Sequence, residues 1–203
     1  TIYATTSITT RHSLMTAFDI FNGDADGICS LLQLRLDSPR EAMLVSGVKR
    51  KVDLLNTLPT EHTIRPGDKI TVLDISMLKN QPGLELALTQ GAQVFYADHH
   101  QSGDVPTHSN LTARINLSPD TCTGLIINKH LEGRHLLWAL TAAFGDNLID
   151  KANSLGSEQG ISRDTLALIE KLGTYINYNG YGASLDDLFY DPAALFAILL
   201  PYA

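Results

Sequence analysis

The chain is poor in cysteine, with two among its 203 residues. Cys29 and Cys122 lie far apart and lack the paired spacing of a disulfide framework or a zinc site, so we expect free, buried thiols in a reducing compartment. Long apolar runs are scarce too. The longest candidate, at 195–200, falls far short of the roughly 20 residues that a membrane-spanning helix needs. We therefore expect a cytoplasmic protein with no membrane segment.

Positive charge is also in short supply, because 15 Lys and Arg residues stand against 22 Asp and Glu residues and give a formal net charge of −7. This balance disfavours a protein whose main task is to grip long nucleic acid through its phosphates. It does not exclude short oligonucleotides, because bound metal ions invert the local sign of the charge. The length suits one sizeable α/β domain, or one domain and part of another.

The first chemical signal lies in residues 18–30, which read FDIFNGDADGICS. This stretch predicts a buried strand, a tight loop that holds Asp24 and Asp26, and a helix. On turn backbone, two carboxylates that are two residues apart can converge on one mouth, whereas on a helix they diverge. Asn22 supplies turn chemistry and is a further candidate ligand. Hard divalent cations bind such oxygen clusters at the carboxyl ends of parallel strands.

Later segments repeat the pattern of an apolar run followed by polar residues. These residues are Asp74 at the end of a strand at 69–74, Asp98, His99 and His100 after a strand at 93–97, and Asp146 after a helix at 136–144. Further strands are predicted at 42–46 and 113–116, and further helices at 28–36, 84–90, 122–131, 162–175 and 187–200. The alternation predicts a doubly wound α/β fold, with a five-stranded, mainly parallel sheet and helices on both faces.

The motifs occur in the order D-x-D-G, an Asp after a strand, Asp-His-His after a strand, and Gly-Asp after a helix. Together they resemble the DHH phosphoesterase superfamily, which includes RecJ-like nucleases, oligoribonucleases and exopolyphosphatases. The resemblance covers residues 17–147. It implies a DHH-type catalytic domain that binds Mn²⁺ or Mg²⁺, two ions in all, and hydrolyses phosphoester bonds. It does not select a substrate.

The resemblance also implies a role for each motif residue. The ligands would be Asp24 for one ion, Asp26, His99 and Asp146 for the other, and Asp74 as the bridge between them. Asp98 would support the ligands from behind, and His100 would contact the scissile phosphate or the leaving group, as a histidine can near neutral pH. Thr121 and Thr123 loosely match a hydroxylated segment of the superfamily, although capping of the next helix is sufficient to explain them.

One position departs from the pattern. Ile20 stands where many members carry a histidine ligand, four residues before the first Asp, although the RecJ-like branch also lacks it. We expect a metal-activated water to hydrolyse a small phosphodiester or phosphoanhydride, with a short oligonucleotide or a nucleotide derivative as the first choice. Polyphosphate or pyrophosphate hydrolysis is the alternative. Ile20 also leaves open a non-catalytic nucleotide-binding domain with the same fold.

We divide the chain into three parts. They are a non-native or disordered tail at 1–14 before a natural start at Met15, a catalytic domain at 15–150, and at 151–203 a helical extension of that domain or the start of a linker to a C-terminal domain that is missing here. The basic cluster at 49–51 suits a solvated loop or a phosphate contact. The polar aromatic loop at 177–182 suits a wall of the site or a linker. Homodimerisation stays open.

Overall fold

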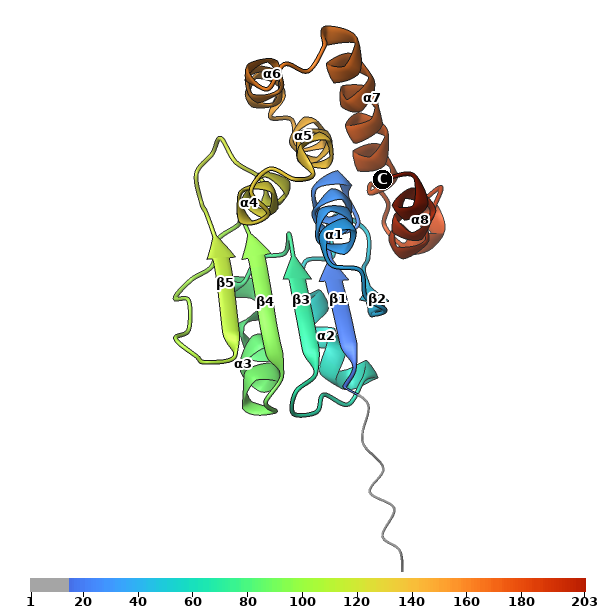
Figure 1. The fold of residues 1–203 in the computed structure, drawn as a ribbon. Helices are drawn as coiled ribbons and strands as arrows, with labels where there is room; N and C mark the ends of the chain where they lie inside the picture. Colours follow the sequence, from blue (N-terminus) through green and yellow to red (C-terminus); the bar gives the residue numbers. More distant parts are fainter. Residues whose placement is uncertain (1–14) are drawn as a thin grey trace, which may run out of the picture.

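The computed structural model describes residues 15–203, so the predicted tail at 1–14 lies outside the described residues (Figure 1). The strands are β1 (Ala17–Phe21), β2 (Met43–Val45), β3 (Lys69–Leu73), β4 (Gln93–Asp98) and β5 (Leu111–Ile115). The α-helices are α1 (Ala25–Asp37), α2 (Leu54–Glu61), α3 (Gln81–Thr89), α4 (Thr123–His130), α5 (Leu136–Gly145), α6 (Ile149–Glu158), α7 (Arg163–Asn179) and α8 (Pro192–Leu199). Short 3₁₀ helices are η1 (Leu78–Asn80), η2 (Leu185–Asp187) and η3 (Leu200–Tyr202).

The sheet confirms the predicted fold class. Its five strands lie in the order β2-β1-β3-β4-β5, and every neighbouring pair is parallel. The chain crosses from one side of β1 to the other between β2 and β3, so the strand order changes direction beside β1. Open α/β sheets bind ligands at such a switch point, outside the carboxyl ends of the strands.

Alternation of side chains along the strands divides the core between the two faces of the sheet. Ile20 in β1 and Val72 in β3 belong to a buried cluster with α2 and α3. Phe21 and Leu73, the next residues of the same strands, belong to a second cluster with α1, α4 and α5. Figure 1 shows α2 and α3 behind the sheet, and α1 and α4 near the tips of the strand arrows. The predicted helices on both faces are therefore confirmed.

Some local predictions differ from the structure. The sequence patterns do not predict α6 or α2, and Pro59 inside α2 argues against a helix when the sequence is read alone. α7 continues to Asn179, whose buried amide bonds the backbone of the next loop, so part of the predicted loop at 177–182 is helical. The predicted helix at 187–200 begins instead at Pro192, because proline suits a first helical turn and the preceding Asp side chain accepts two backbone N–H groups there.

The helices after residue 150 pack onto the elements that surround the carboxyl ends of the strands. α7 runs along α5, and the Phe196 ring of α8 lies 6.1 Å from the Phe21 ring of β1. Figure 1 shows α5, α6 and α7 beyond the ends of the strand arrows. The C-terminal helices thus share a core with the sheet and border the edge where the motif residues lie.

The scarce residue types behave as the sequence predicts. Cys29 and Cys122 are both free thiols, and both are buried. Burial raises the pKa of each thiol well above its ordinary value, so neither is a reactive thiolate at neutral pH. Within residues 15–203, no helix combines the length and the apolar character that a bilayer crossing requires.

A buried ion-pair cluster ties β1 to α1. Asp19 is 1% exposed, and its two carboxylate oxygens each accept a hydrogen bond of 2.7 Å from the Arg35 guanidinium. Arg40 donates to the same carboxylate at 2.5 Å and to the Thr71 hydroxyl of β3. Burial alone would raise the pKa of Asp19, but the two arginines lower it below its ordinary value. The carboxylate therefore stays ionised inside the fold.

We expect Asp19→Ala to lower the free energy of unfolding by about 3–5 kcal/mol, because it leaves the largely buried Arg35 guanidinium without its counter-charge. Urea denaturation followed by circular dichroism measures this change. The exposed Asp104 provides the control, and its substitution by Ala should cost less than about 0.5 kcal/mol. Equal effects at the two positions would contradict this account of Asp19.

Candidate metal centre

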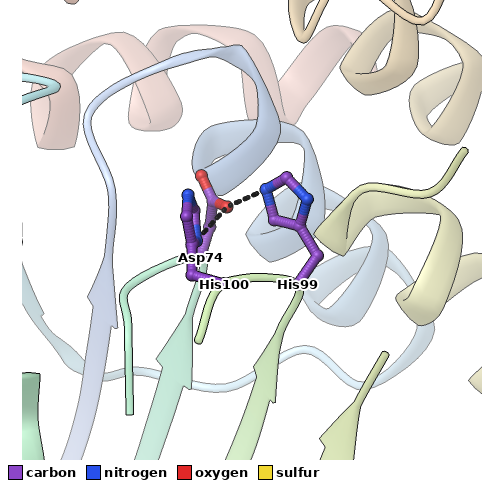
Figure 2. Close-up of side chains that lie close together, drawn as sticks. All are labelled: Asp74, His99 and His100. Atoms are coloured by element: carbon purple, nitrogen blue, oxygen red, sulfur yellow. Dashed lines mark ion pairs between the residues drawn. The ribbon is translucent and has the colours of Figure 1, made fainter. Parts of the chain in front are cut away.

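The structure brings most of the motif residues to one place at the carboxyl edge of the sheet. Parallel strands end at the same edge, so the loops after β1, β3 and β4 meet there. The C-terminal end of α5 lies beside these loops. The residues gathered are Asp26 in α1, Asp74 after β3, Asp98, His99 and His100 at the end of β4, and Asp146 after α5. Figure 2 shows the rings of His99 and His100 turned toward the Asp74 carboxylate.

His99 has the geometry of a metal ligand. Its Nδ1 lies 3.1 Å from the backbone oxygen of Thr121, which favours the tautomer with the proton on Nδ1. Nε2 then presents its lone pair to three carboxylates, with Asp74 Oδ1 at 3.4 Å, Asp26 Oδ2 at 3.7 Å and Asp146 Oδ2 at 3.8 Å. These separations exceed good hydrogen bonds but match ligand atoms that each lie about 2.1 Å from one shared ion.

Asp26 is held between two helix N-termini. It lies in the first turn of α1, and its carboxylate accepts hydrogen bonds from the backbone N–H groups of Thr123 at 2.8 Å and Gly124 at 2.6 Å, in the first turn of α4. Helix N-termini carry partial positive charge and favour an anion. A Cβ at position 124 would collide with Ala142 of α5, so glycine is required where α4 approaches α5 and Asp26.

Asp74 occupies a left-handed backbone conformation, with φ of 59°. Aspartate tolerates this region better than most residues, and such conformations cluster at functional sites. Its Oδ1 accepts a hydrogen bond of 3.1 Å from the Thr123 hydroxyl. The N-cap residue of α4 is Cys122, which makes no side-chain capping bond, and the N–H groups of the first turn are taken by Asp26, so capping does not explain the Thr123 hydroxyl. Thr123 instead fixes the Asp74 carboxylate.

The site concentrates buried negative charge. Burial, followed by the nearby Asp26 and Asp24 carboxylates, raises the pKa of Asp74 well above its ordinary value. Burial and Asp26 likewise raise the pKa of Asp146 to about 6. Asp98 Oδ2 is buried and has no hydrogen-bond partner within residues 15–203. Carboxylates in this state need a cation, and an oxygen set with one imidazole fits Mn²⁺ or Mg²⁺.

Asp98 and His100 form a separate pair beside these ligands. His100 Nδ1 lies 2.7 Å from Asp98 Oδ1, and Asp98 is fully buried while the His100 side chain is 44% exposed. The hydrogen bond to Asp98 raises the pKa of His100 against the opposing effect of burial. Asp98 therefore orients the ring and favours its protonated form, in which Nε2 remains free to donate.

Asp24 borders the ligand group but pairs with a lysine. Its Oδ2 is 2.6 Å from the ammonium of Lys49, which also donates to Asn177 Oδ1 of α7 at 2.9 Å. Burial alone would lower the pKa of Lys49, but Asp24 raises it above its ordinary value. The other residues predicted near this position are Ile20, which is fully buried in the cluster with α2 and α3, and Asn22, whose amide donates to the Lys49 backbone oxygen.

Sequence patterns marked Lys49 and Asn177 only as members of a basic cluster and of a polar loop. The two segments are 128 positions apart, and nothing in their local sequence predicts that they meet. The loop after β2 and the end of α7 are brought together by the backbone hydrogen bond from Lys49 N to Gly180 O, at 2.9 Å. The packing of α7 against α5 and α1 places the end of α7 beside the loop after β2, where Asn177 meets Lys49.

Neither a protein-family model nor a curated protein matches the chain, whereas several solved structures do. One is a DHH domain from a member of a family of ribosomal proteins, 12% identical, with a TM-score of 0.53 over 80% of this chain and 47% of that chain. This chain has the fold of a DHH domain. The resemblance that the motifs suggest is thus confirmed for the fold.

Two other solved structures align less closely. RecJ from Thermus thermophilus, in complex with Mn²⁺, is 16% identical, with a TM-score of 0.46 over 92% of this chain and 34% of that chain. An uncharacterized protein from Helicobacter pylori is 12% identical, with a TM-score of 0.42 over 92% of this chain and 61% of that one. The chain therefore spans less than two thirds of the length of each of these three structures.

We expect Asp74→Asn to stabilise the metal-free DHH fold near pH 7.5 and to abolish its stabilisation by Mn²⁺. The buried carboxylate is unfavourable without a cation, and asparagine accepts the same left-handed backbone. In the wild type, Mn²⁺ at 100 times its Kd should add about 2.7 kcal/mol. Thermal unfolding in EDTA and in Mn²⁺ measures both effects, with Asp104→Asn as the control of equal charge change. A wild type that Mn²⁺ leaves unchanged would refute the metal site.

We also expect the metal-free chain to lose stability as the pH rises from about 4 to about 7. The folded pKa of Asp146, about 6, lies above its ordinary value of 3.8, so folding favours the protonated carboxyl. Its stabilising contribution is complete below the unfolded pKa and disappears as the pH rises through the folded one. Unfolding in EDTA across this range measures the slope, and Asp146→Asn should reduce it. An identical slope in Asp146→Asn would show that another group causes the loss of stability with pH.

Proposed function

We propose that the chain is a divalent-metal-dependent phosphoesterase that hydrolyses a small phosphodiester or phosphoanhydride. The observation that carries this proposal is the position of His99 Nε2 among the Asp26, Asp74 and Asp146 oxygens, at 3.4–3.8 Å. In a purely structural histidine, Nε2 would be expected to form a direct hydrogen bond, as Nδ1 does to Thr121, instead of facing three acids at these distances. Atoms that bind one shared metal ion lie at such distances from one another, because the ion stands between them.

Mn²⁺ or Mg²⁺ would be held by the ligand group of Asp26, Asp74, His99 and Asp146, in which the carboxylates surround His99 Nε2. Two trios of ligand atoms meet here, Asp26 with His99 and Asp146, and Asp74 with His99 and His100, and we assign His100 to the substrate because its nearest partner is Asp98. The imidazole among oxygen ligands favours Mn²⁺. Such an ion lowers the pKa of a bound water and neutralises charge on the phosphoryl oxygens. Asp98 supports the site from behind by fixing His100, and the Thr123 hydroxyl fixes the Asp74 carboxylate.

His100 supplies the proton that the leaving group needs. The attacking water would give up a proton to solvent as its oxygen bonds to phosphorus and the bond to the leaving oxygen breaks, and the His100 imidazolium would donate its Nε2 proton to that leaving oxygen. Asp98 Oδ1 accepts from Nδ1 and holds the ring in the orientation that this transfer needs. This division leaves His99 as a ligand and His100 as the group that acts on the substrate.

A short oligonucleotide or a nucleotide derivative is the preferred substrate. The net charge of −7 opposes a long nucleic acid, whereas a small anion needs only the local cations of the site. Polyphosphate or pyrophosphate remains a second phosphate substrate to test. Residues 15–150 would form the catalytic domain, and 151–203 an extension of it, because α7 contributes Asn177 to the site. Two free, buried thiols suit the cytoplasm.

A non-catalytic nucleotide-binding domain is the competing function, and the pairing of Asp24 with Lys49 is the observation that favours it. A panel of short oligoribonucleotides, cyclic dinucleotides, pyrophosphate and polyphosphate, assayed with Mn²⁺ and with EDTA, separates the two. We expect Mn²⁺-dependent turnover of a substrate that carries a nucleoside. Mn²⁺ binding without turnover of any member of the panel would favour the non-catalytic domain.

We expect the two adjacent histidines to fail differently when each is replaced by alanine. His99→Ala should weaken Mn²⁺ binding, and excess Mn²⁺ should restore part of the activity. His100→Ala should keep Mn²⁺ affinity nearly intact and lower kcat by about 10²–10⁴-fold, the usual contribution of a positioned acid. Calorimetric Mn²⁺ titration and steady-state kinetics measure the two effects.

The exposed His108 provides a matched control for both variants, since its replacement by alanine should alter neither Mn²⁺ affinity nor kcat. Both site variants should unfold cooperatively, because neither loses an apolar core side chain. Equal losses of Mn²⁺ affinity in His99→Ala and His100→Ala would show that the assignment of roles is wrong. Unchanged activity in both would remove the phosphoesterase function.

A further inference from the structure

We propose that the Lys49 ammonium occupies the place of a second cation, so that the site binds one divalent ion and not two. This inference rests on the proposed function and specifies how its charge is balanced. The ammonium lies 2.6 Å from Asp24 Oδ2, in a side chain that is 25% exposed. Asp24 is the N-cap of α1, and the first turn of that helix holds the ligand Asp26. Lys49 therefore belongs to the same mouth as the ligand group.

The hydrogen bonds of Asp24 leave little room for a second ion. Asp24 is the N-cap of α1, and its Oδ1 accepts the backbone N–H groups of Asp26 and Gly27, each at 3.1 Å. Its Oδ2 is taken by Lys49. An ion bound to Oδ2 would have to lie beside the ammonium and would be repelled by it, whereas turning Oδ1 toward an ion would undo the cap.

Among the described residues, the groups near Asp24 supply few replacement ligands. Ile20, which stands four residues before Asp24, carries no donor atom and points into the core with α2 and α3. Asn22 Nδ2 donates to the Lys49 backbone oxygen, and the buried Asn22 Oδ1, which has no hydrogen-bond partner within residues 15–203, is an oxygen that a second ion could still use. The charge of the ammonium, and not a complete lack of oxygens, therefore has to exclude that ion.

Lys49 is built into the site from two elements distant in sequence. Asn177 Oδ1 in the last turn of α7 accepts from the ammonium at 2.9 Å, and the ring centroid of Tyr181 lies 5.7 Å from it. Gly180 O accepts the Lys49 backbone N–H. The C-terminal end of a helix carries partial negative charge and favours a cation at this position. The ammonium is therefore a fixed charge, unlike that of a mobile surface lysine.

One divalent ion leaves the site close to neutral. Lys49 neutralises Asp24, so the four carboxylates of Asp26, Asp74, Asp98 and Asp146 face the three positive charges of one divalent ion and the His100 imidazolium, with one net negative charge left over. A substrate phosphate that enters the mouth would then meet the ion on one side and the ammonium on the other. A lysine supplies such a charge as a compact point donor.

The number of Mn²⁺ ions per chain tests this inference without any measurement of turnover. Calorimetric titration of the full chain should give one Mn²⁺ for the wild type. Lys49→Met should admit a second, weaker Mn²⁺, and its electron paramagnetic resonance spectrum should show coupling between the two ions. Lys51→Met, an exposed change in the same basic segment, should keep one ion. Lys49→Gln, which retains hydrogen-bonding capacity without the charge, replaces Lys49→Met if that variant does not fold.

Each outcome has a definite meaning. Two Mn²⁺ ions per wild-type chain would overturn the inference and leave the proposed phosphoesterase intact. One ion in the wild type and in both Lys49 variants would show that the ammonium is not what excludes the second cation, and would also overturn it. A wild type that binds no Mn²⁺ would refute the proposed function itself. The two failures are therefore distinguishable.

Discussion

Burial of several carboxylates at one edge of a parallel sheet is the constraint on which the site depends. Asp24, Asp26, Asp74 and Asp98 are each at most 3% exposed, although ionised acids are costly away from water. The fold meets part of this cost with backbone N–H groups at two helix N-termini and with the Lys49 ammonium. A divalent cation would meet the rest. The arrangement therefore favours a bound ion before any substrate arrives.

Two buried aspartates of the β1–α1 segment have opposite kinds of partner. Asp19, in the middle of β1, is neutralised within the protein by Arg35 and Arg40, and its role is to join β1 to α1. Asp26, just beyond the end of β1, faces His99 and other acids instead. A closed ion pair stabilises a fold, whereas an acid cluster short of positive charge can bind a cation. The charge of the neighbouring side chains therefore distinguishes a structural acid from a functional one.

The C-terminal helices do more than cover the core. α7 places Asn177 against the Lys49 ammonium, and the loop after it accepts the Lys49 backbone N–H through Gly180. α5 delivers Asp146, and α8 packs Phe196 onto β1. Motions of α7 relative to β1 would therefore change the position of a positive charge at the mouth. Packing in this part of the DHH fold bears directly on the electrostatics of the site.

The sequence by itself determined the parallel sheet and most of the cluster at its edge. Apolar strands followed by Asp24, Asp74 and Asp98 suffice, because parallel strands end on one side and bring such residues together. Tertiary structure alone decided which acids pair with a cationic side chain and which face the histidine. Asp24 and Asp26 look equivalent in D-x-D-G, yet one meets Lys49 and the other meets His99. Those partners come from distant segments, and local sequence periodicity carries no record of such contacts.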